Sequence, residues 1–369
     1  MELFFLQAEC GDAAHIRYQG DDGQIHHVFI DAGFERTYGH VLADRIARAG
    51  VIDLFVVSHV HDDHIGGAIA YTRAITRGEV NDKVLQWCYN PPRPNTPIVN
   101  TTNTISSAAS IGQGDELVAF LKCQDKLPAA DILQTSPPLD LHGLRLTWLS
   151  PSLSKLNRLR EKYANLSIPL EKEEDNSVSG AAGATGNDYH LTIEDFNLKT
   201  WKQDDNVENG SSIAFLSELN SFRVLWLADA HPKLLAQSIK DLGYTPKNRL
   251  KCDYVKITHH GSKGNNSDGL YELIDCRHYV ISADGVNRHY LPSKESLARI
   301  LRNRQRNIKA DRYHFYFTYD NTVLRSIFDV EGPEVFDKWN FECHFIPAGQ
   351  KWLELPDNTV KNQPVDQSK

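Results

Sequence analysis

The sequence predicts an α/β protein in which sheets are covered by helices. Over the first 70 residues, short β-type runs alternate with turns and a helix-spaced stretch, which gives the order strand, strand, helix, strand. From Ser211 onward, strands and helices alternate again. The chain has 369 residues, of which 41% are hydrophobic, so it can bury a large core in one big domain or two modest ones.

The N-terminal elements follow from hydrophobic spacing. Leu42, Ile46 and Ala49 lie at helical spacing, and a second helix is expected after Gly67. A turn at 21–23 separates two of the β-type runs. The expected strands are 2–7, 15–18, 25–30 and 54–57.

The middle of the chain is less regular. Helical character runs over 104–126, a strand is expected at 144–149 and a helix at 156–166. We expect 152–208 to be an insertion that contains a mobile loop, 171–187, because this loop is too poor in apolar residues to pack. The loop either flanks an active site or is a plain surface insertion.

The regular pattern that resumes after Ser211 extends to the C-terminus. The segment Pro292 to Leu297 is a good helix start, with Ser293 as N-cap and Glu295 in the first turn. We expect a single domain over 1–355, followed by a polar tail, 356–369. Strands are predicted at 212–216, 223–227, 254–257, 278–282, 313–319 and 341–346, and helices at 232–242 and 269–275.

Bulk properties limit the function classes. The net charge of −8 argues against a broadly basic nucleic-acid-binding surface, but not against a local basic groove. Six scattered cysteines without a Cys-x-x-Cys pair indicate reduced thiols, and no leader or long apolar run is present, so we expect a cytoplasmic protein without a membrane span. One basic run either tracks a phosphate backbone or is a solvated helix face. It comprises Arg299, Arg302, Arg304, Arg306 and Lys309.

The most informative segment follows the strand expected at 54–57. Within six residues it holds His59, His61, Asp63 and His64. Imidazole nitrogen and carboxylate oxygen are ligands that borderline divalent metals prefer. His59 and His61, two residues apart at a strand end, can share one metal. Asp63 and His64, at the turn into a helix, face a second position. The alternative is a polar loop with accidental histidines.

This His-x-His-x-Asp-His pattern resembles the metal-binding motif of the metallo-β-lactamase superfamily. Other segments resemble one branch of it, which holds the soluble hydrolase domain of the DNA-uptake channel protein ComEC and stand-alone relatives. The resemblance covers residues 1 to about 300 and implies an αββα sandwich, with a central insertion and extra C-terminal strands, that binds two divalent ions, zinc or manganese. The segments that carry it are Phe5 to Ile16, Phe29 to Gly33, Asn209 to Phe215, Leu225 to Asp229 and Lys256 to Ser262.

The resemblance also implies roles for single residues. Asp229 would bridge the two metals, although an aspartate after a strand is also a common helix N-cap and Pro232 follows closely. His259 or His260 would donate a proton to the leaving oxygen or stabilise phosphoryl oxygens. Because successive residues at a strand end face opposite sides, we expect only one of this pair to face the site. Asp63 would orient a water activated by the metals.

Two departures from the family pattern affect the metal sites. Asn209 stands where most members of the superfamily have a third histidine, and a neutral amide is a poorer zinc ligand, so the first site is expected to be weaker, completed by water, or better suited to manganese. Leu291 stands where the family has a ligand before a proline. His289, two residues earlier, either replaces that ligand or is an ordinary loop histidine.

These observations predict a metal-dependent hydrolase of phosphodiesters. Two divalent ions would carry +4 and Asp63 with Asp229 −2, so the centre would attract an anionic diester. The ComEC-type resemblance implies DNA as substrate, a nuclease in DNA processing or anti-phage defence, and protein partners from a defence operon. Two alternatives stay open: a hydrolase of a small phosphoester or other ester, and a metal-poor scaffold or sensor subunit of a defence complex.

Overall fold

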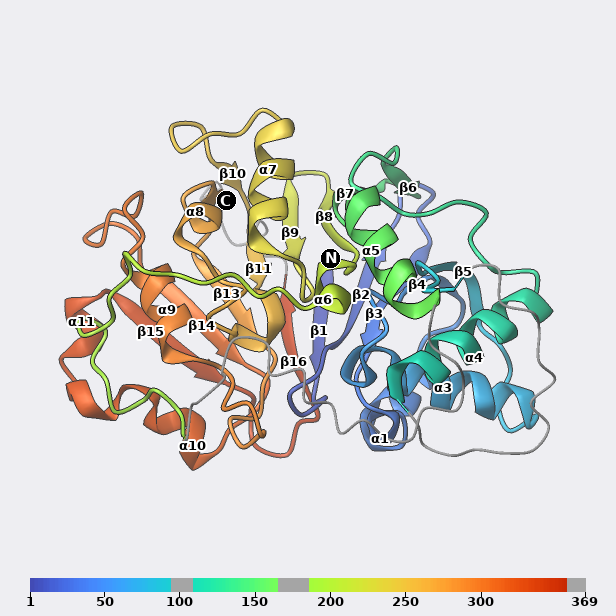
Figure 1. The fold of residues 1–369 in the computed structure, drawn as a ribbon. Helices are drawn as coiled ribbons and strands as arrows, with labels where there is room; N and C mark the ends of the chain where they lie inside the picture. The colour runs from blue at the N-terminus through green and yellow to red at the C-terminus, as the bar shows by residue number, and fades with distance from the viewer. Residues whose placement is uncertain (94–108, 165–185, 357–369) are drawn as a thin grey trace, which may run out of the picture.

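The chain folds into two large β-sheets with helices on their outer faces, which confirms the predicted mixed α/β class (Figure 1). The computed structural model describes residues 1–93, 109–164 and 186–356. The loop predicted at 171–187 therefore falls almost wholly outside the described residues, and so does the polar tail after Pro356. Within the described ranges, no helix is both long and apolar enough to cross a membrane.

The first sheet has six strands. The two pairings at one end of the sheet, β3 with β4 and β4 with β5, are parallel, and the other pairings are antiparallel. In spatial order the strands are β16 (Trp352–Pro356), β1 (Glu2–Leu6), β2 (Ala13–Gln19), β3 (Ile25–Ala32), β4 (Ile52–Val56) and β5 (Val84–Cys88).

The second sheet has eight strands. Its pairings from β15 to β9 are parallel, and those from β9 to β6 are antiparallel. In spatial order the strands are β15 (Phe341–Phe345), β14 (Tyr313–Phe317), β13 (His278–Ile281), β11 (Tyr254–Lys256), β9 (Phe222–Trp226), β8 (Ala214–Leu219), β7 (Leu144–Ser150) and β6 (Leu139–Leu141).

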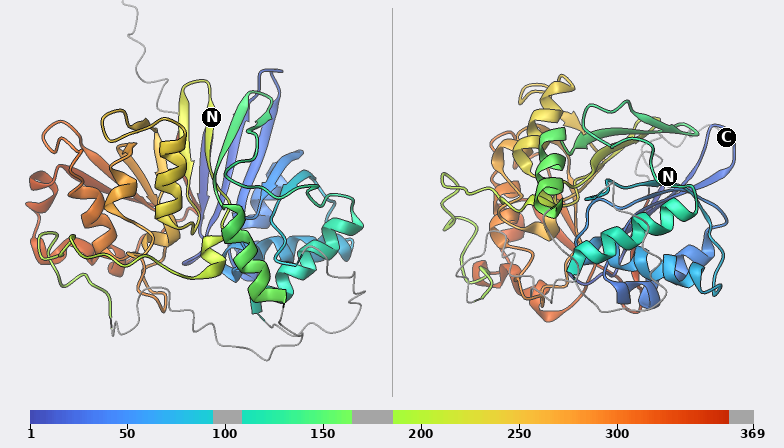
Figure 2. Two further views of the ribbon diagram at one scale, coloured as in Figure 1. Left: turned by 45° about the horizontal axis from the view of Figure 1, so that its top comes forward. Right: turned by 45° about the vertical axis from the view of Figure 1, so that its right-hand side comes forward.

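The two sheets face each other across a shared hydrophobic core. Ile16 and Leu54 of the first sheet are fully buried in the same cluster as Phe215 and Trp226 of the second. Because side chains on the outer face of each sheet are also buried, another layer must cover each outer face. Helices provide it, on the right of Figure 1 for the N-terminal half and on the left for the C-terminal half, and the turned views in Figure 2 show the same division.

The helices that cover the first sheet are α2, α3, α4 and α5, and those that cover the second are α7, α8, α9 and the turns near residue 330. Their bounds, with the shorter connecting turns, are α1 (Glu35–Thr37), η1 (Tyr38–Leu42), α2 (Ala43–Arg48), α3 (Asp62–Thr76), α4 (Ala109–Cys123), α5 (Leu153–Ala164), α6 (Val207–Gly210), α7 (Pro232–Asp241), η2 (Thr258–Gly261), α8 (Asp268–Tyr271), α9 (Lys294–Leu301), α10 (Thr322–Arg325), η3 (Ser326–Glu331) and α11 (Val335–Lys338).

Helix α9 begins where the sequence predicts, but with a different cap. Ser293 occupies the N-cap position, yet its side chain makes no capping hydrogen bond. Asp188 accepts from the backbone N–H of Lys294 at 2.7 Å and from that of Glu295 at 3.0 Å. A carboxylate from a distant loop therefore satisfies the free N–H groups of the first turn.

One predicted helix is wrong in part. The helix expected at 269–275 stops at Tyr271, because Ile274 and Asp275 pair in parallel with Leu250 and Lys251 as the short strands β12 (Ile274–Asp275) and β10 (Leu250–Lys251). The backbone bonds to β10 take the place of the last helical turn. An apolar run this short does not distinguish the two states.

Two members of the basic run after residue 298, Arg299 and Arg306, are buried and cannot contact a phosphate backbone. Arg299 is fully buried and pairs with Asp268 and Glu295. Arg306 is buried and donates to the backbone carbonyls of Leu301, Asp311, Trp339 and Asn340. These guanidinium groups connect loops to helix α9. The hypothesis that the run contacts a phosphate backbone is therefore wrong for Arg299 and Arg306.

Candidate metal centre

The predicted ligands come together where parallel strands of both sheets end. His59 to His64 follow β4 and lead into α3, whose first turn contains Asp63 and His64. Asp229 follows β9, and His259 follows the neighbouring strand β11 in the turn η2. Because the carboxyl ends of parallel strands meet at one edge of a sheet, side chains far apart in sequence become neighbours there.

Asp229 lies at the middle of this cluster and is only 1% exposed. Its Oδ2 is 3.4 Å from His64 Nε2, 3.6 Å from His259 Nε2 and 3.7 Å from His59 Nε2. Its Oδ1 is 3.7 Å from His260 Nε2. The two carboxylate oxygens therefore face different imidazoles, as a residue between two cation positions would require.

The remaining distances divide the cluster into two groups. His61 Nδ1 lies 3.1 Å from His59 Nε2. On the other side, Asp63 Oδ2 lies 3.2 Å from His260 Nε2 and 3.8 Å from His64 Nε2. The groups His59–His64–Asp229 and Asp12–His64–His260 each bring three donor atoms within 4.8 Å of one another, close enough to hold a metal ion.

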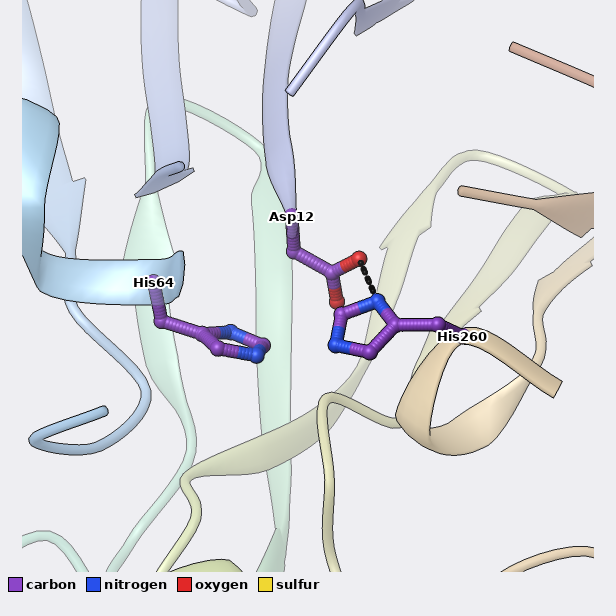
Figure 3. A group of neighbouring side chains, drawn as sticks. All are labelled: Asp12, His64 and His260. Carbon is purple, nitrogen blue, oxygen red and sulfur yellow. Dashed lines mark ion pairs between the residues drawn. The ribbon is translucent and has the colours of Figure 1, made fainter. Parts of the chain in front are cut away.

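His259 and His260 both face the cluster, so the expectation that one of them would turn away is wrong. Both adopt left-handed backbone conformations, with φ of 46° and 52°, inside the turn η2. The alternation of a strand does not apply in such a turn. Figure 3 shows His260 and His64 pointing toward each other from opposite sides, with Asp12 above them.

Left-handed backbone is concentrated around the centre. Besides the two histidines, Asp31 has φ of 55° and Ala228, directly before Asp229, has φ of 42°. Residues other than glycine rarely adopt this conformation, which costs of order 1–3 kcal/mol each and tends to occur at functional sites. The backbone is therefore locally strained where it orients these side chains.

Side chains of the protein contact the Nδ1 atoms of His59 and His64. His59 Nδ1 is 3.0 Å from Ser58 Oγ, which itself donates to Asp31 Oδ2 at 2.8 Å. His64 Nδ1 lies 2.8 Å from the same Asp31 oxygen. With Nδ1 held by these partners, Nε2 is the nitrogen of each ring that faces Asp229 and that would bind a cation.

The two C-terminal rings are oriented in the same way. His259 Nδ1 lies 2.8 Å from Asn265 Oδ1. His260 Nδ1 is 3.1 Å from the carbonyl of Ser282 and 3.2 Å from Asp12 Oδ1, the ion pair drawn in Figure 3. Nothing in the sequence indicates that Asn265, Ser282 or Asp12 orients a ring. Only Asp12 lay in a segment that resembled the family.

Several buried polar atoms at the centre have no hydrogen-bond partner. Leaving one such atom unsatisfied costs about 1–3 kcal/mol, so a group of them in a native site requires an explanation. A bound cation would supply it, since imidazole nitrogens and carboxylate or amide oxygens can be its ligands. The atoms are His64 Nε2, His260 Nε2, Asp229 Oδ1, Asp229 Oδ2 and Asn209 Oδ1.

The charges of the centre depend on one another. Burial opposes protonation of His64, but the carboxylates of Asp229 and Asp63 raise the pKa of this ring well above its ordinary value. Burial likewise opposes ionisation of Asp229, whose pKa is still held well below its usual range by the histidines, His259 foremost. The pKa of His59, buried among other imidazoles, is well below normal. The ionised carboxylates and the neutral ring of His59 suit a divalent cation, and a cation bound at His64 would displace the proton that this ring otherwise holds.

Asn209 belongs to the supporting network. Its Nδ2 donates to Asp204 Oδ2 at 2.6 Å, and Asn265 Nδ2 donates to the same oxygen at 3.0 Å. Asp204 is buried at 2% exposure, and its Oδ2 lies 3.8 Å from His259 Nδ1. The amide at 209 thus helps to fix the ring of His259, a role that the sequence did not suggest.

His289 is not among the side chains that converge on Asp229. Its Nε2 accepts a hydrogen bond from Arg288 Nε at 3.0 Å, and its backbone N–H donates to Asn287 Oδ1. The donor-atom groups found among the described residues do not include it. Leu291 is buried and also bonds through its backbone to Asn287. A metal-binding role of His289 stays a prediction that no observed contact supports.

Comparison with known proteins yields little beyond the site itself. No model of a known protein family matches the chain, and no curated protein does. Among solved structures, the chain is similar to one described as MIM-2 metallo-β-lactamase, with 14% identity over 69% of this chain and 72% of that one, at a TM-score of 0.31. A TM-score this low does not establish a common fold.

Proposed function

We propose that this protein is a metal-dependent hydrolase of phosphodiesters with two divalent cation positions, and that its fold is the αββα sandwich of the metallo-β-lactamase superfamily. One observation carries the proposal. Nitrogen and oxygen atoms from both halves of the chain converge on Asp229, buried and without hydrogen-bond partners. Zinc and manganese are both compatible with this donor set.

The first cation position would use His59, His61 and His259, and Asp229 would lie between the two positions. His259 thus takes the place left open by the neutral amide of Asn209. A mononuclear group of three imidazoles and one carboxylate is a complete four-coordinate set for zinc.

The second position would use Asp63, His64 and His260, again with Asp229. His260 takes the place left open by Leu291. Because both apparent losses are compensated by the adjacent histidines, the alternative of a degenerate scaffold loses the observations that favoured it.

Bound divalent ions would supply Lewis acidity and would lower the pKa of a coordinated water toward neutrality. The chain supplies the rest. Asp229 is 1% exposed, whereas the side chain of Asp63 is 21% exposed, so Asp63 is the carboxylate that can contact a water or substrate at the mouth of the centre. His259 and His260 would act as ligands, and their role in proton donation stays a prediction.

Phosphodiesters, and DNA in particular, are the substrates that we propose. Two divalent ions would outweigh the ionised Asp63 and Asp229, and a centre of net positive charge stabilises an anionic diester as it reacts. The ComEC-type resemblance favours DNA over small esters. A role in DNA processing or anti-phage defence, together with protein partners, is part of the same proposal.

The test is incubation of the purified protein, with added zinc or manganese, with labelled single-stranded DNA, double-stranded DNA, RNA and a small chromogenic phosphodiester. We expect DNA cleavage that falls steeply with added salt, because contacts along a polyanion release counterions. Cleavage of the small diester alone, with weak salt dependence, would replace DNA by a small substrate.

Two neighbouring aspartates give a matched pair of variants. Asp63→Ala should reduce cleavage at least about 100-fold, as expected when a ligand of a catalytic metal is lost. Asp62→Ala should retain activity, because its Oδ1 accepts from Gln113 Nε2 at 2.6 Å and does not face the cluster. Equal cleavage by Asp63→Ala and the unmodified protein would identify a contaminating nuclease and remove the proposal.

A further inference from the structure

A second group of metal-ligand side chains lies at the outer edge of the eight-stranded sheet, on strands β14 and β15 at the left of Figure 1. Along β14, Tyr313, Phe315 and Phe317 are buried against the helices. His314 therefore projects from the opposite face, as strand alternation requires. In the parallel register, Glu342 is the Cα partner of His314, and His344 is that of Tyr316.

This face is partly open because the opposing sheet does not extend over it. The shared core between the sheets includes Val280 of β13 and has Tyr316 of β14 packed against it, but it contains no residue of β15. The side chains of His314, Glu342 and His344 are 22%, 39% and 38% exposed. Ions and water can therefore reach all three.

Three donor atoms of this group form a nearly regular triangle. His314 Nδ1 lies 3.0 Å from His344 Nε2. Glu342 Oε2 lies 3.4 Å from each of those nitrogens. Zinc–ligand bonds of 2.0–2.1 Å in a tetrahedral site place the ligand atoms about 3.3 Å apart. The triangle thus has the dimensions of one face of a tetrahedral coordination shell.

We propose that His314, Glu342 and His344 form a separate binding site for a borderline divalent transition metal such as zinc or copper, with water completing the shell. Two imidazoles and one carboxylate are a recurrent ligand set for zinc and its neighbours and a poor one for calcium or magnesium. The site is independent of the candidate metal centre and of the proposed hydrolase activity.

The surroundings hold the three donors in place. Arg312 binds Glu342 Oε1 at 2.9 Å and leaves Oε2 for the triangle. The ring of His278 stacks on His314 with centroids 4.8 Å apart, and Tyr316 stacks on His344 with centroids 4.7 Å apart. Pre-oriented donors lose less conformational entropy when an ion binds.

The protonation state of the rings also suits a cation. Burial, followed by the neighbouring histidine and opposed by Glu342, lowers the pKa of His314, and burial lowers that of His344. Neutral imidazole is the form that coordinates metal. Arg312, a cation beside the triangle, is already paired with the carboxylate oxygen that the triangle does not use.

The test is a titration of metal-stripped protein with zinc, in competition with a chromophoric chelator. The full chain should bind one equivalent more than either Glu342→Gln or His344→Ala, whereas His190→Ala, which removes an exposed histidine elsewhere, should bind as the unmodified protein does. Copper-loaded Asp229→Asn protein should show imidazole nitrogen couplings in its electron paramagnetic resonance spectrum, which His344→Ala in the same background should weaken.

Equal zinc stoichiometry in the unmodified protein, Glu342→Gln and His344→Ala would overturn the proposal and leave a histidine–histidine hydrogen bond as the role of the group. Thermal denaturation of each variant checks that it is folded. Because the comparison is a difference of one equivalent, it holds whether or not the candidate metal centre binds ions or hydrolyses DNA.

Discussion

Asp229 concentrates the chemistry of the centre in one side chain. It is a buried carboxylate whose oxygens lie 3.4–3.7 Å from the Nε2 atoms of several histidines. Burying a charge is unfavourable unless the charge is paired and hydrogen-bonded. Neighbouring side chains that make no hydrogen bond to the charge offset only part of this unfavourable free energy. Divalent ions between Asp229 and its neighbours would remove that cost, which is why the residue is the best marker of the site.

A first prediction distinguishes His260 from His289 as ligands. His260→Ala should lose one equivalent of metal and at least about 10-fold of hydrolytic activity, because its Nε2 faces both Asp229 and Asp63. His289→Ala should keep both, since its ring bonds to Arg288. Metal analysis after dialysis measures the first quantity, and initial rates measure the second. The reverse result, with loss only in His289→Ala, would mean that the loop at 287–292 closes on the centre.

At this scale the spacing of the sequence predicts the contiguous ligands and the family resemblance predicts Asp229, but neither predicts how His259 and His260 are oriented. His59, His61, Asp63 and His64 follow a recognisable buried strand, so their common position could be inferred from spacing alone. That His259 and His260 both face inward depends on two left-handed residues in a row. Nothing in the local sequence predicts a left-handed backbone conformation for two successive histidines. The partners that orient the rings, such as Asn265, become visible only when the chain is folded.

Helix α3 is the element that places Asp63 and His64. It begins at Asp62, earlier than the spacing of its apolar residues suggests, so that part of the ligand motif forms the first helical turn. Gly67 allows the helix to approach β3, because a Cβ at this position would collide with the carbonyl oxygen of Ala32. Glycine is therefore required here by the close contact between the helix and the strand, and not by a special backbone conformation.

A second prediction tests this contact with two mid-helix glycines. Gly67→Ala should destabilise the protein by about 1–3 kcal/mol, since the rigid backbone of Ala32 cannot yield, and it should weaken metal binding by displacing His64. Gly112→Ala in α4 meets nothing within 4 Å and should stabilise by about 0.5–1 kcal/mol, the ordinary gain of alanine over glycine in a helix. Urea denaturation measures both. Similar changes in the two variants would contradict the close packing of α3.

The elements that the sequence predicts well are long and have clear periodicity, such as α7 and strand β9. It fails where distant pairing decides the state. Ile274 and Asp275 become strand because β10 is beside them, and Trp352–Pro356 becomes the edge strand β16 because β1 offers a free edge. Hydrophobic spacing within a segment contains no information about these partners.

At the scale of the whole molecule, the candidate metal centre joins the two sheets. Ligands from His59 to His64 are carried by the first sheet and α3, whereas Asp229, His259 and His260 are carried by the second sheet. The shared core already holds the sheets together, but at this edge polar groups without partners face one another. Bound cations would act there as cross-links between the halves of the chain.

A third prediction follows for stability after metal removal. Ions that bind only the folded chain stabilise it by about 4 kcal/mol per site at a free concentration 1,000 times the Kd. Treatment with a chelator should therefore lower the melting temperature by several degrees, and added zinc or manganese should restore it. The measurement belongs in the His344→Ala background, so that the separate site on β14 and β15 contributes nothing. Asp229→Asn in that background should respond much less to the chelator, because the residue between both positions has lost its charge. A melting temperature that does not change when the metal content falls to zero would show that the two sheets are not linked by cations.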